Sequence, residues 1–361
     1  MGHNLLIKNI YEVIDMGLPE NSSIKLRTKF RKGERNLITD VPGVKVGQVT
    51  KVDNNMGIHT GVTTIIPHDG NMFREKVLAG VSIINGFGKS VGLVQIEELG
   101  TIETPIVMTN TFGVGTALNA LTKYMLKDNP EIGVSTGTVN CIVTECNDGE
   151  INDIRGMHVT EDDVCTALDN ADTDFEEGAV GSGTGMICMD MKGGIGSASR
   201  TVECDGKEYT IGAILMSNFG MKGNLRIDGA LADDEYRHID KPEKGSCIIV
   251  IGTDIPLNER QLKRVAKRAT VGLARTGSFL GNGSGDIAIA FSNGNIVPHF
   301  TDKQILDIKM FNDDKIDLVF EATAEVVEEC VISSLYHADT VVGVRGKKVL
   351  SLKENYGESI Y

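Results

Sequence analysis

The chain has 361 residues, of which 41% are hydrophobic and 24% are charged, a composition that excludes a disordered, fibrous or low-complexity protein. A formal net charge of −14 argues against nucleic-acid binding, because a basic surface supplies most of the affinity for phosphate groups. No apolar run approaches the ~18 residues of a membrane-spanning helix, so neither nucleic acid nor a membrane is expected as a partner.

The cysteines and the N-terminal residues indicate in which cellular compartment the protein is expected. Seven cysteines are scattered along the chain without a CxxC pair, which favours reduced thiols over a disulfide framework. The N-terminal stretch carries Glu12 and Asp15 and lacks the positive head and the cleavage site of a secretory signal. The sequence therefore predicts a cytoplasmic protein.

The composition along the chain suggests how the chain divides into an extension and a domain. Residues 1–35 are polar and irregular and are expected to form an N-terminal extension, followed by a single domain over 36–361. The only clean linker inside that domain is the charged, proline-containing stretch at about 234–244, which is expected to be accessible.

In the first part of the domain, apolar residues alternate around Pro42–Gly43, which predicts a hairpin. Short apolar runs predict strands at 61–67, 78–86, 104–110, 138–146 and 210–220. After the third of these strands, apolar spacings of three and four residues predict a helix. Its buried face comprises Val114, Ala117, Leu118, Leu121 and Met125.

The second part continues the pattern with strands predicted at 247–253 and 286–294. A helix is expected to begin near Asp254, because a proline such as Pro256 is tolerated in the first helical turn. Its apolar face comprises Leu262, Val265, Ala266, Ala269 and Leu273. A longer helix is predicted from about Asp314 to Tyr336. Strands outnumber helices, which favours sheets layered against helices in an α/β sandwich.

The pair Gly245–Ser246 stands directly before a buried strand. If the peptide bond between the two residues broke, Ser246 would carry both a hydroxyl nucleophile and a free α-amine. An unperturbed α-amine has a pKa of about 7.7–8.0, so a useful fraction is neutral and can act as the local base. The alternative is that glycine and serine only turn the chain into the strand.

Other motifs for catalysis are weak. The seven histidines form no HExxH and no close pair, so no metal site is expected. No GxSxG elbow occurs, and the glycine cluster at 181–185 lacks the Lys-Ser/Thr ending of a phosphate loop.

Several sequence blocks, in order, make the region from Asn36 to about Lys348 resemble a known family. The blocks are NLITDVPGVKVG, GVTTIIPHDGNMFREKV, NGFGKSVGLVQIEELGTIETPIVMTNTFGVGTALNAL, GTGM, KGGIGSASR, GSCIIVIGTD, QLKRVAKRATVGLARTGS and GNGSGDIAIAFS. The family that they resemble is the self-processing aminopeptidases, which include L-aminopeptidase/D-Ala-esterase/amidase, β-peptidyl aminopeptidases and nylon-oligomer hydrolases.

The resemblance implies a four-layer αββα sandwich of the N-terminal-nucleophile-hydrolase type, shared with the ornithine acetyltransferase superfamily. It implies self-cleavage between Gly245 and Ser246, which gives an α chain of residues 1–245 and a β chain of 246–361. It also implies a homo-oligomer of αβ units, commonly a tetramer, and no cofactor. The implied activity is a serine aminopeptidase or amidase that acts on short peptides, amino-acid amides or esters through an acyl-enzyme.

The same resemblance implies roles for individual residues. Ser246 corresponds to the nucleophile and Asn218 to the donor that stabilises the oxyanion. Ser284 and Asp286 correspond to the pair beside the nucleophile, where the serine orients the attacking group and the carboxylate holds a cationic amine.

Three further positions correspond to the substrate site. Glu145 matches the acid that receives the free amino group of the substrate. Asn147 stands where some relatives have a tyrosine, which leaves the stereochemistry and size of the accepted residue open. Lys192 matches a lysine that lies near the site in some relatives.

Two alternatives remain at this point. Acyltransferases of the ornithine acetyltransferase type share the implied architecture, but they have threonine at the cut and pass the acyl group to an amine. A non-catalytic small-molecule-binding protein could keep the fold without being cut.

Overall fold

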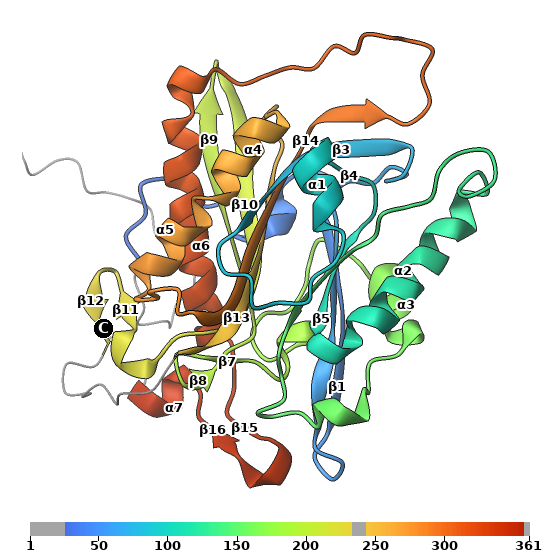
Figure 1. Ribbon diagram of the computed structural model, residues 1–361. Helices are drawn as coiled ribbons and strands as arrows, with labels where there is room; N and C mark the ends of the chain where they lie inside the picture. The colour runs from blue at the N-terminus through green and yellow to red at the C-terminus, as the bar shows by residue number, and fades with distance from the viewer. Residues whose placement is uncertain (1–25, 233–242, 357–361) are drawn as a thin grey trace, which may run out of the picture.

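The computed structural model describes residues 26–232 and 243–356, and it has a mixed α/β fold of sheets and helices (Figure 1). The first 25 residues of the expected N-terminal extension, and most of the linker expected at 234–244, lie outside the described residues. No helix within the described ranges is long and apolar enough to cross a membrane.

The smaller sheet has four strands in the order β1-β2-β5-β6. Neighbours are antiparallel except for β5 and β6, which are parallel. The strands are β1 (Lys45–Asp53), β2 (Ile58–Ile66), β5 (Ile106–Asn110) and β6 (Ile142–Cys146). Helices α2 (Val114–Asp128) and α3 (Glu161–Asp169) pack against this sheet.

The larger sheet has six strands in the order β4-β3-β14-β13-β10-β9, and only β13 and β14 run parallel. These strands are β3 (Glu75–Ile83), β4 (Thr101–Ile102), β9 (Ile195–Cys204), β10 (Lys207–Asn218), β13 (Lys244–Thr253) and β14 (Gly283–Pro298). Helices α1 (Leu93–Leu99), α4 (Glu259–Ala266) and α6 (Asp317–Tyr336) contact this sheet, and α5 (Ala269–Arg275) packs on α6.

The remaining elements are short. They are β7 (Ile187–Cys188), β8 (Met191–Lys192), β11 (Arg226–Ile227), β12 (Ala230–Leu231), β15 (Val341–Val342), β16 (Lys348–Val349) and α7 (Leu352–Tyr356).

Two hydrophobic cores meet at the larger sheet, and strand β13 contributes to both. Ile248 and Val250 belong to the core that also holds side chains of the smaller sheet, whereas Ile249 and Ile251 belong to the core beneath α4 and α6. Successive side chains of a strand point to opposite faces, so a continuous apolar run is what a strand buried on both faces requires. This explains the run that follows Ser246.

Most of the expected elements are confirmed to within a few residues, including the strands, helix α2 and the long helix α6. The hairpin expected around Pro42–Gly43 is wrong. The Asp40 carboxylate accepts hydrogen bonds from the N–H groups of Arg35 (3.0 Å) and Leu37 (3.2 Å), which folds Ile38–Asp40 into a 3-10 turn. Strand β1 begins after that turn and pairs with β2 instead.

The helix expected from Asp254 begins only at Glu259 and is divided into the two helices α4 and α5. Asn258 is its N-cap, because the Asn258 side chain accepts from the Gln261 N–H at 2.9 Å. The apolar face expected for one helix is shared by α4 and α5, which are separated near Lys267.

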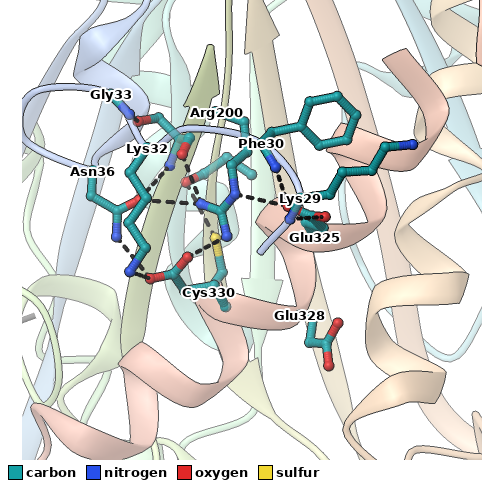
Figure 2. Close-up of polar contacts among 12 residues, drawn as sticks. Lys29, Phe30, Lys32, Gly33, Asn36, Arg200, Glu325, Glu328 and Cys330 are labelled. Carbon is teal, nitrogen blue, oxygen red and sulfur yellow. Dashed lines mark hydrogen bonds and ion pairs between the residues drawn. The ribbon is translucent and has the colours of Figure 1, made fainter. Parts of the chain in front are cut away.

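A buried ion-pair network joins β9 to α6 (Figure 2). Arg200 is 1% exposed, and its guanidinium contacts Glu325 at 3.1 Å and Glu329 at 2.6 Å. Burial opposes the ionisation of Glu329, but the charges of Arg200 and Lys32 outweigh burial and lower its pKa. The cations and carboxylates therefore depend on one another in a site from which water is excluded.

The segment before the domain joins the same network. Lys32 pairs with Glu329 at 2.9 Å, and the backbone N–H of Lys29 donates to Glu325 at 2.9 Å (Figure 2). The Asn36 amide donates to Glu329 and accepts from Arg200. The described part of the N-terminal extension is thus fastened to the domain by buried polar contacts.

Candidate active site

Ser246 lies near the start of β13, at the centre of the larger sheet. Its register partners are Asn218 on β10 and Gly285 on β14. It is 4% exposed, so its neighbours control the environment of its hydroxyl. A Cβ at Gly245 would lie 2.2 Å from the Asn218 carbonyl oxygen, so only glycine fits before this serine.

The side-chain amide of Asn218 has a defined orientation. Its Oδ1 accepts from the Ile187 N–H at 3.0 Å, and its Nδ2 donates to the Asn147 carbonyl at 3.1 Å. An NH₂ group has two hydrogens, so the second can serve another acceptor. A donor fixed in this way is suited to stabilise a developing negative charge beside Ser246.

Ser284 and Asp286 form a hydrogen-bonded pair on β14, next to the strand that carries Ser246. Ser284 Oγ donates to Asp286 Oδ1 at 2.7 Å, and Asn85 Nδ2 donates to Asp286 Oδ2 at 3.0 Å. Burial raises the pKa of Asp286, and the hydrogen bonds from Ser284 and Asn85 oppose this effect. The register partners of the pair are Gly245 and Cys247, so Ser284 and Asp286 lie beside the two residues that adjoin Ser246 in the chain.

Glu145 comes from the smaller sheet and faces the same region. Its carboxylate accepts from the Lys89 N–H at 2.7 Å and from the Thr111 hydroxyl. A Cβ on Gly88 would lie 3.4 Å from Glu145 Oε1 and 3.9 Å from Gly285 Cα. Gly88 therefore separates the acid from the strand position that pairs with Ser246.

Cys146 joins the two sheets at this point. Burial raises the pKa of its thiol well above the usual range, and a hydrogen bond with the side chain of Ser246 opposes the increase. The thiol also contacts the Met216 carbonyl at 3.8 Å. Because it stays protonated, Cys146 acts as a small polar neighbour of Ser246 rather than as a second nucleophile.

Lys192 lies behind Asn218 and is fully buried. Its ammonium donates to the carbonyls of Gly183 (3.1 Å), Met186 (2.8 Å) and Gly193 (2.5 Å). Burial lowers the pKa of Lys192 to about 7. Met186 directly precedes Ile187, the residue whose N–H orients Asn218, so the lysine holds the segment that orients the Asn218 amide.

Asn147 is exposed, and its side-chain Oδ1 accepts from the Gly149 N–H at 2.9 Å. Its contact with the centre is made by its backbone carbonyl, which accepts from Asn218.

The expected residues therefore lie on or directly after the strands β6, β8, β10, β13 and β14, which belong to three sheets. Three contributors were not expected from the sequence: Asn85, Thr111 and Cys146. Asn85 and Thr111 follow the strands β3 and β5, and both lie in blocks that carry the resemblance, so their position at strand ends was the available signal. In the described ranges, no group of three or more His, Cys, Asp or Glu side chains is arranged to hold a metal ion.

Comparison with known proteins gives consistent matches over most of the chain. The family described as Peptidase family S58 matches residues 36–349. The β-peptidyl aminopeptidase BapA of Sphingosinicella microcystinivorans is 37% identical over 347 residues, covering 89% of this chain and 86% of the relative. BapA of Sphingosinicella xenopeptidilytica is 33% identical over 371 residues, covering 96% of this chain and 92% of the relative.

Solved structures are also similar. A Pyrococcus horikoshii OT3 protein has a TM-score of 0.87 at 50% identity, and a Burkholderia sp. β-aminopeptidase has 0.85 at 38%. The L-aminopeptidase D-Ala-esterase/amidase of Ochrobactrum anthropi has 0.85 at 37%, and it is described as a prototype of the serine aminopeptidases with a variant of the Ntn hydrolase fold. Each match covers 93% of this chain and 96% of the other.

Proposed function

Because the chain belongs to peptidase family S58 and is a hydrolase of the aminopeptidase type, we propose that it cleaves itself between Gly245 and Ser246. The cut chain then releases the N-terminal residue from short peptides, amino-acid amides or esters. The observation that carries this proposal is the position of Ser246, which pairs with Asn218 on one neighbouring strand. On the other neighbouring strand, Ser284 and Asp286 pair with Gly245 and Cys247, the residues on either side of Ser246 in the chain.

In the proposed self-cleavage, Ser246 Oγ attacks the Gly245 carbonyl, and the peptide bond is replaced by an ester while the Ser246 nitrogen takes up a proton. Water then hydrolyses the ester, which leaves a Gly245 carboxylate and a Ser246 α-amine. Asn218 donates to the oxyanion of the tetrahedral intermediate. The absence of a side chain at Gly245 supports this step, because the bond lies against the Asn218 carbonyl.

In the proposed hydrolysis, the Ser246 α-amine accepts the hydroxyl proton as Oγ attacks the substrate carbonyl. The protonated amine then gives that proton to the leaving group, and water releases the acyl group by the same steps. Ser284 orients the attacking group, and Asp286 stabilises the cationic amine across the neighbouring strand. Both roles are supported by the hydrogen bond between Ser284 and Asp286.

Glu145 is proposed to bind the ammonium group of the substrate. A carboxylate held at a fixed place relative to the nucleophile restricts the cut to the first residue. Its two fixed donors, the Lys89 N–H and the Thr111 hydroxyl, support this role because they hold the carboxylate in one orientation. Lys192 is proposed to hold the turn that orients Asn218, and Asn147 to frame the substrate entrance through its backbone.

The layer arrangement, the cellular location and the oligomeric state are also part of the proposal. A four-layer αββα sandwich, shared with the ornithine acetyltransferase superfamily, is supported by the helices packed on each sheet and by the two cores. A cytoplasmic location is supported by the seven cysteines, all of them free. A homo-oligomer of αβ units, commonly a tetramer, follows from the resemblance.

Intact mass and N-terminal sequencing of the purified protein test the proposal. We expect two chains, one ending at Gly245 and one beginning at Ser246, together with hydrolysis of an aminoacyl p-nitroanilide. A single uncut chain with full activity would refute the proposal. Transfer of the acyl group to an added amine, in preference to water, would identify an acyltransferase instead.

Glu145→Gln should reduce kcat/KM for an aminoacyl p-nitroanilide by about 100-fold, mainly through KM, because a buried carboxylate that pairs with the ammonium is lost. Self-cleavage should remain complete, since Glu145 lies on the other sheet. Glu150→Gln is the matched control, because Glu150 is exposed on the following turn and pairs with Lys347. An unchanged KM in Glu145→Gln would contradict the assignment.

A further inference from the structure

Glu243 lies two residues before Gly245, and its side chain holds two separate loops. Its Oε1 accepts from the Gly220 N–H at 3.0 Å, and its Oε2 accepts from the Gly281 N–H at 3.0 Å. The residue is 6% exposed. A carboxylate can accept with both oxygen atoms at once, so the two N–H donors match the glutamate side chain.

The two loops are the ones that present the catalytic groups. Gly220 lies two residues after Asn218, at the end of β10. Gly281 lies three residues before Ser284, at the start of β14. The Gly281 carbonyl accepts from Asn85 Nδ2 at 3.2 Å, and the same amide donates to Asp286. A continuous set of hydrogen bonds therefore runs from Glu243 to Asp286.

Glycines pack closely against Glu243. A Cβ at Gly281 would lie 2.6 Å from Glu243 Oε2, and a Cβ at Gly283 would lie 2.9 Å from the Glu243 carbonyl oxygen. Gly220 has a φ of +86°, a conformation that favours glycine. These glycines let the backbone N–H groups approach the carboxylate closely.

We propose that Glu243 is a positioning residue for self-cleavage, which fastens the segment before the scissile bond to the loops that carry Asn218 and Ser284. The inference rests on the proposed function, because it concerns the same bond. Gly245 has no side chain and Lys244 is exposed. On the N-terminal side of the scissile bond, Glu243 is therefore the nearest buried side chain that can fix the Gly245 carbonyl relative to the Ser246 hydroxyl and the Asn218 amide.

Rates of self-cleavage during cell-free synthesis test this role, with the uncut chain and its two products followed on denaturing gels. Glu243→Gln keeps the volume but replaces one acceptor with a donor, and we expect cleavage about 10- to 100-fold slower than in the wild type. Glu243→Asp keeps both acceptors on a shorter side chain and should restore an intermediate rate. Glu203→Gln, an exposed glutamate on β9, is the matched control and should cleave at the wild-type rate.

These variants separate positioning from packing. A role in packing alone predicts that Glu243→Gln cleaves as fast as the wild type, and that result would overturn the inference while leaving the proposed function intact. A wild-type chain that never cleaves would overturn both. If Glu243→Gln does not fold, Gly281→Ala tests the same hydrogen bond at its donor residue, because the added Cβ would displace the Glu243 carboxylate. It should slow cleavage similarly, and an unchanged rate would refute the role of Glu243.

Discussion

Ser246→Ala should yield one uncut chain that hydrolyses no aminoacyl p-nitroanilide. The substitution removes the hydroxyl proposed to attack Gly245, so neither the ester nor the free α-amine should form. Loss of a nucleophile of this kind costs about 10⁶-fold in kcat in serine hydrolases, which places residual turnover below detection. Intact mass and a p-nitroaniline release assay measure the two consequences separately.

The matched control for this variant is Ser135→Ala, an exposed serine remote in sequence from the cut. It should be cut and active like the wild type. Because Ser246 is buried beside Cys146 and Asn218, the alanine variant should still fold, and its circular dichroism spectrum should match that of the wild type. A Ser246→Ala protein that turns over substrate would place the nucleophile elsewhere.

Arg200→Met should lower the free energy of unfolding by about 3–5 kcal/mol, because it leaves Glu325 and Glu329 buried without their main cation. Methionine fills much of the arginine volume, so the loss arises from charge rather than from a cavity. Equilibrium denaturation in guanidinium chloride, followed by far-UV circular dichroism, measures the change.

Two comparisons isolate the cause. Arg31→Met removes an exposed ion pair with Glu208 and should cost at most about 1 kcal/mol. Replacing Arg200, Glu325 and Glu329 together with apolar residues should recover much of the stability. A buried ion-pair network and a well-packed apolar cluster of similar volume often contribute about equally to the free energy of unfolding. A loss as small as that of Arg31→Met would show that the network contributes little.

Local patterns in the sequence predicted much of the fold. The strands and helices α2 and α6 follow from apolar runs and from spacings of three and four residues. The expected hairpin failed because a single side chain, Asp40, satisfies backbone N–H groups that would otherwise enter a strand. Such a competition between side chain and backbone is not visible in an apolar pattern.

The site was harder to derive from the residues alone. Glycine before serine at a strand start suggested a nucleophile, but its partners Asn218 and Glu145 followed from resemblance, because pairing between distant strands is not encoded locally. Lys192 shows the same limit. A lysine before two glycines is typical of a solvated turn, yet three backbone carbonyls hold it in the interior.

The Arg200 network also bears on what the proposed scission leaves behind. Arg200 precedes residue 245, whereas Glu325 and Glu329 follow it. The part of β13 after the break pairs with β10, which precedes the break, and with β14, which follows it. Cleavage would then create a new carboxylate at Gly245 and a new amine at Ser246, while the α and β chains stay associated through the sheet and the ion-pair network. Mature material should accordingly melt in one cooperative transition and resist separation without denaturant.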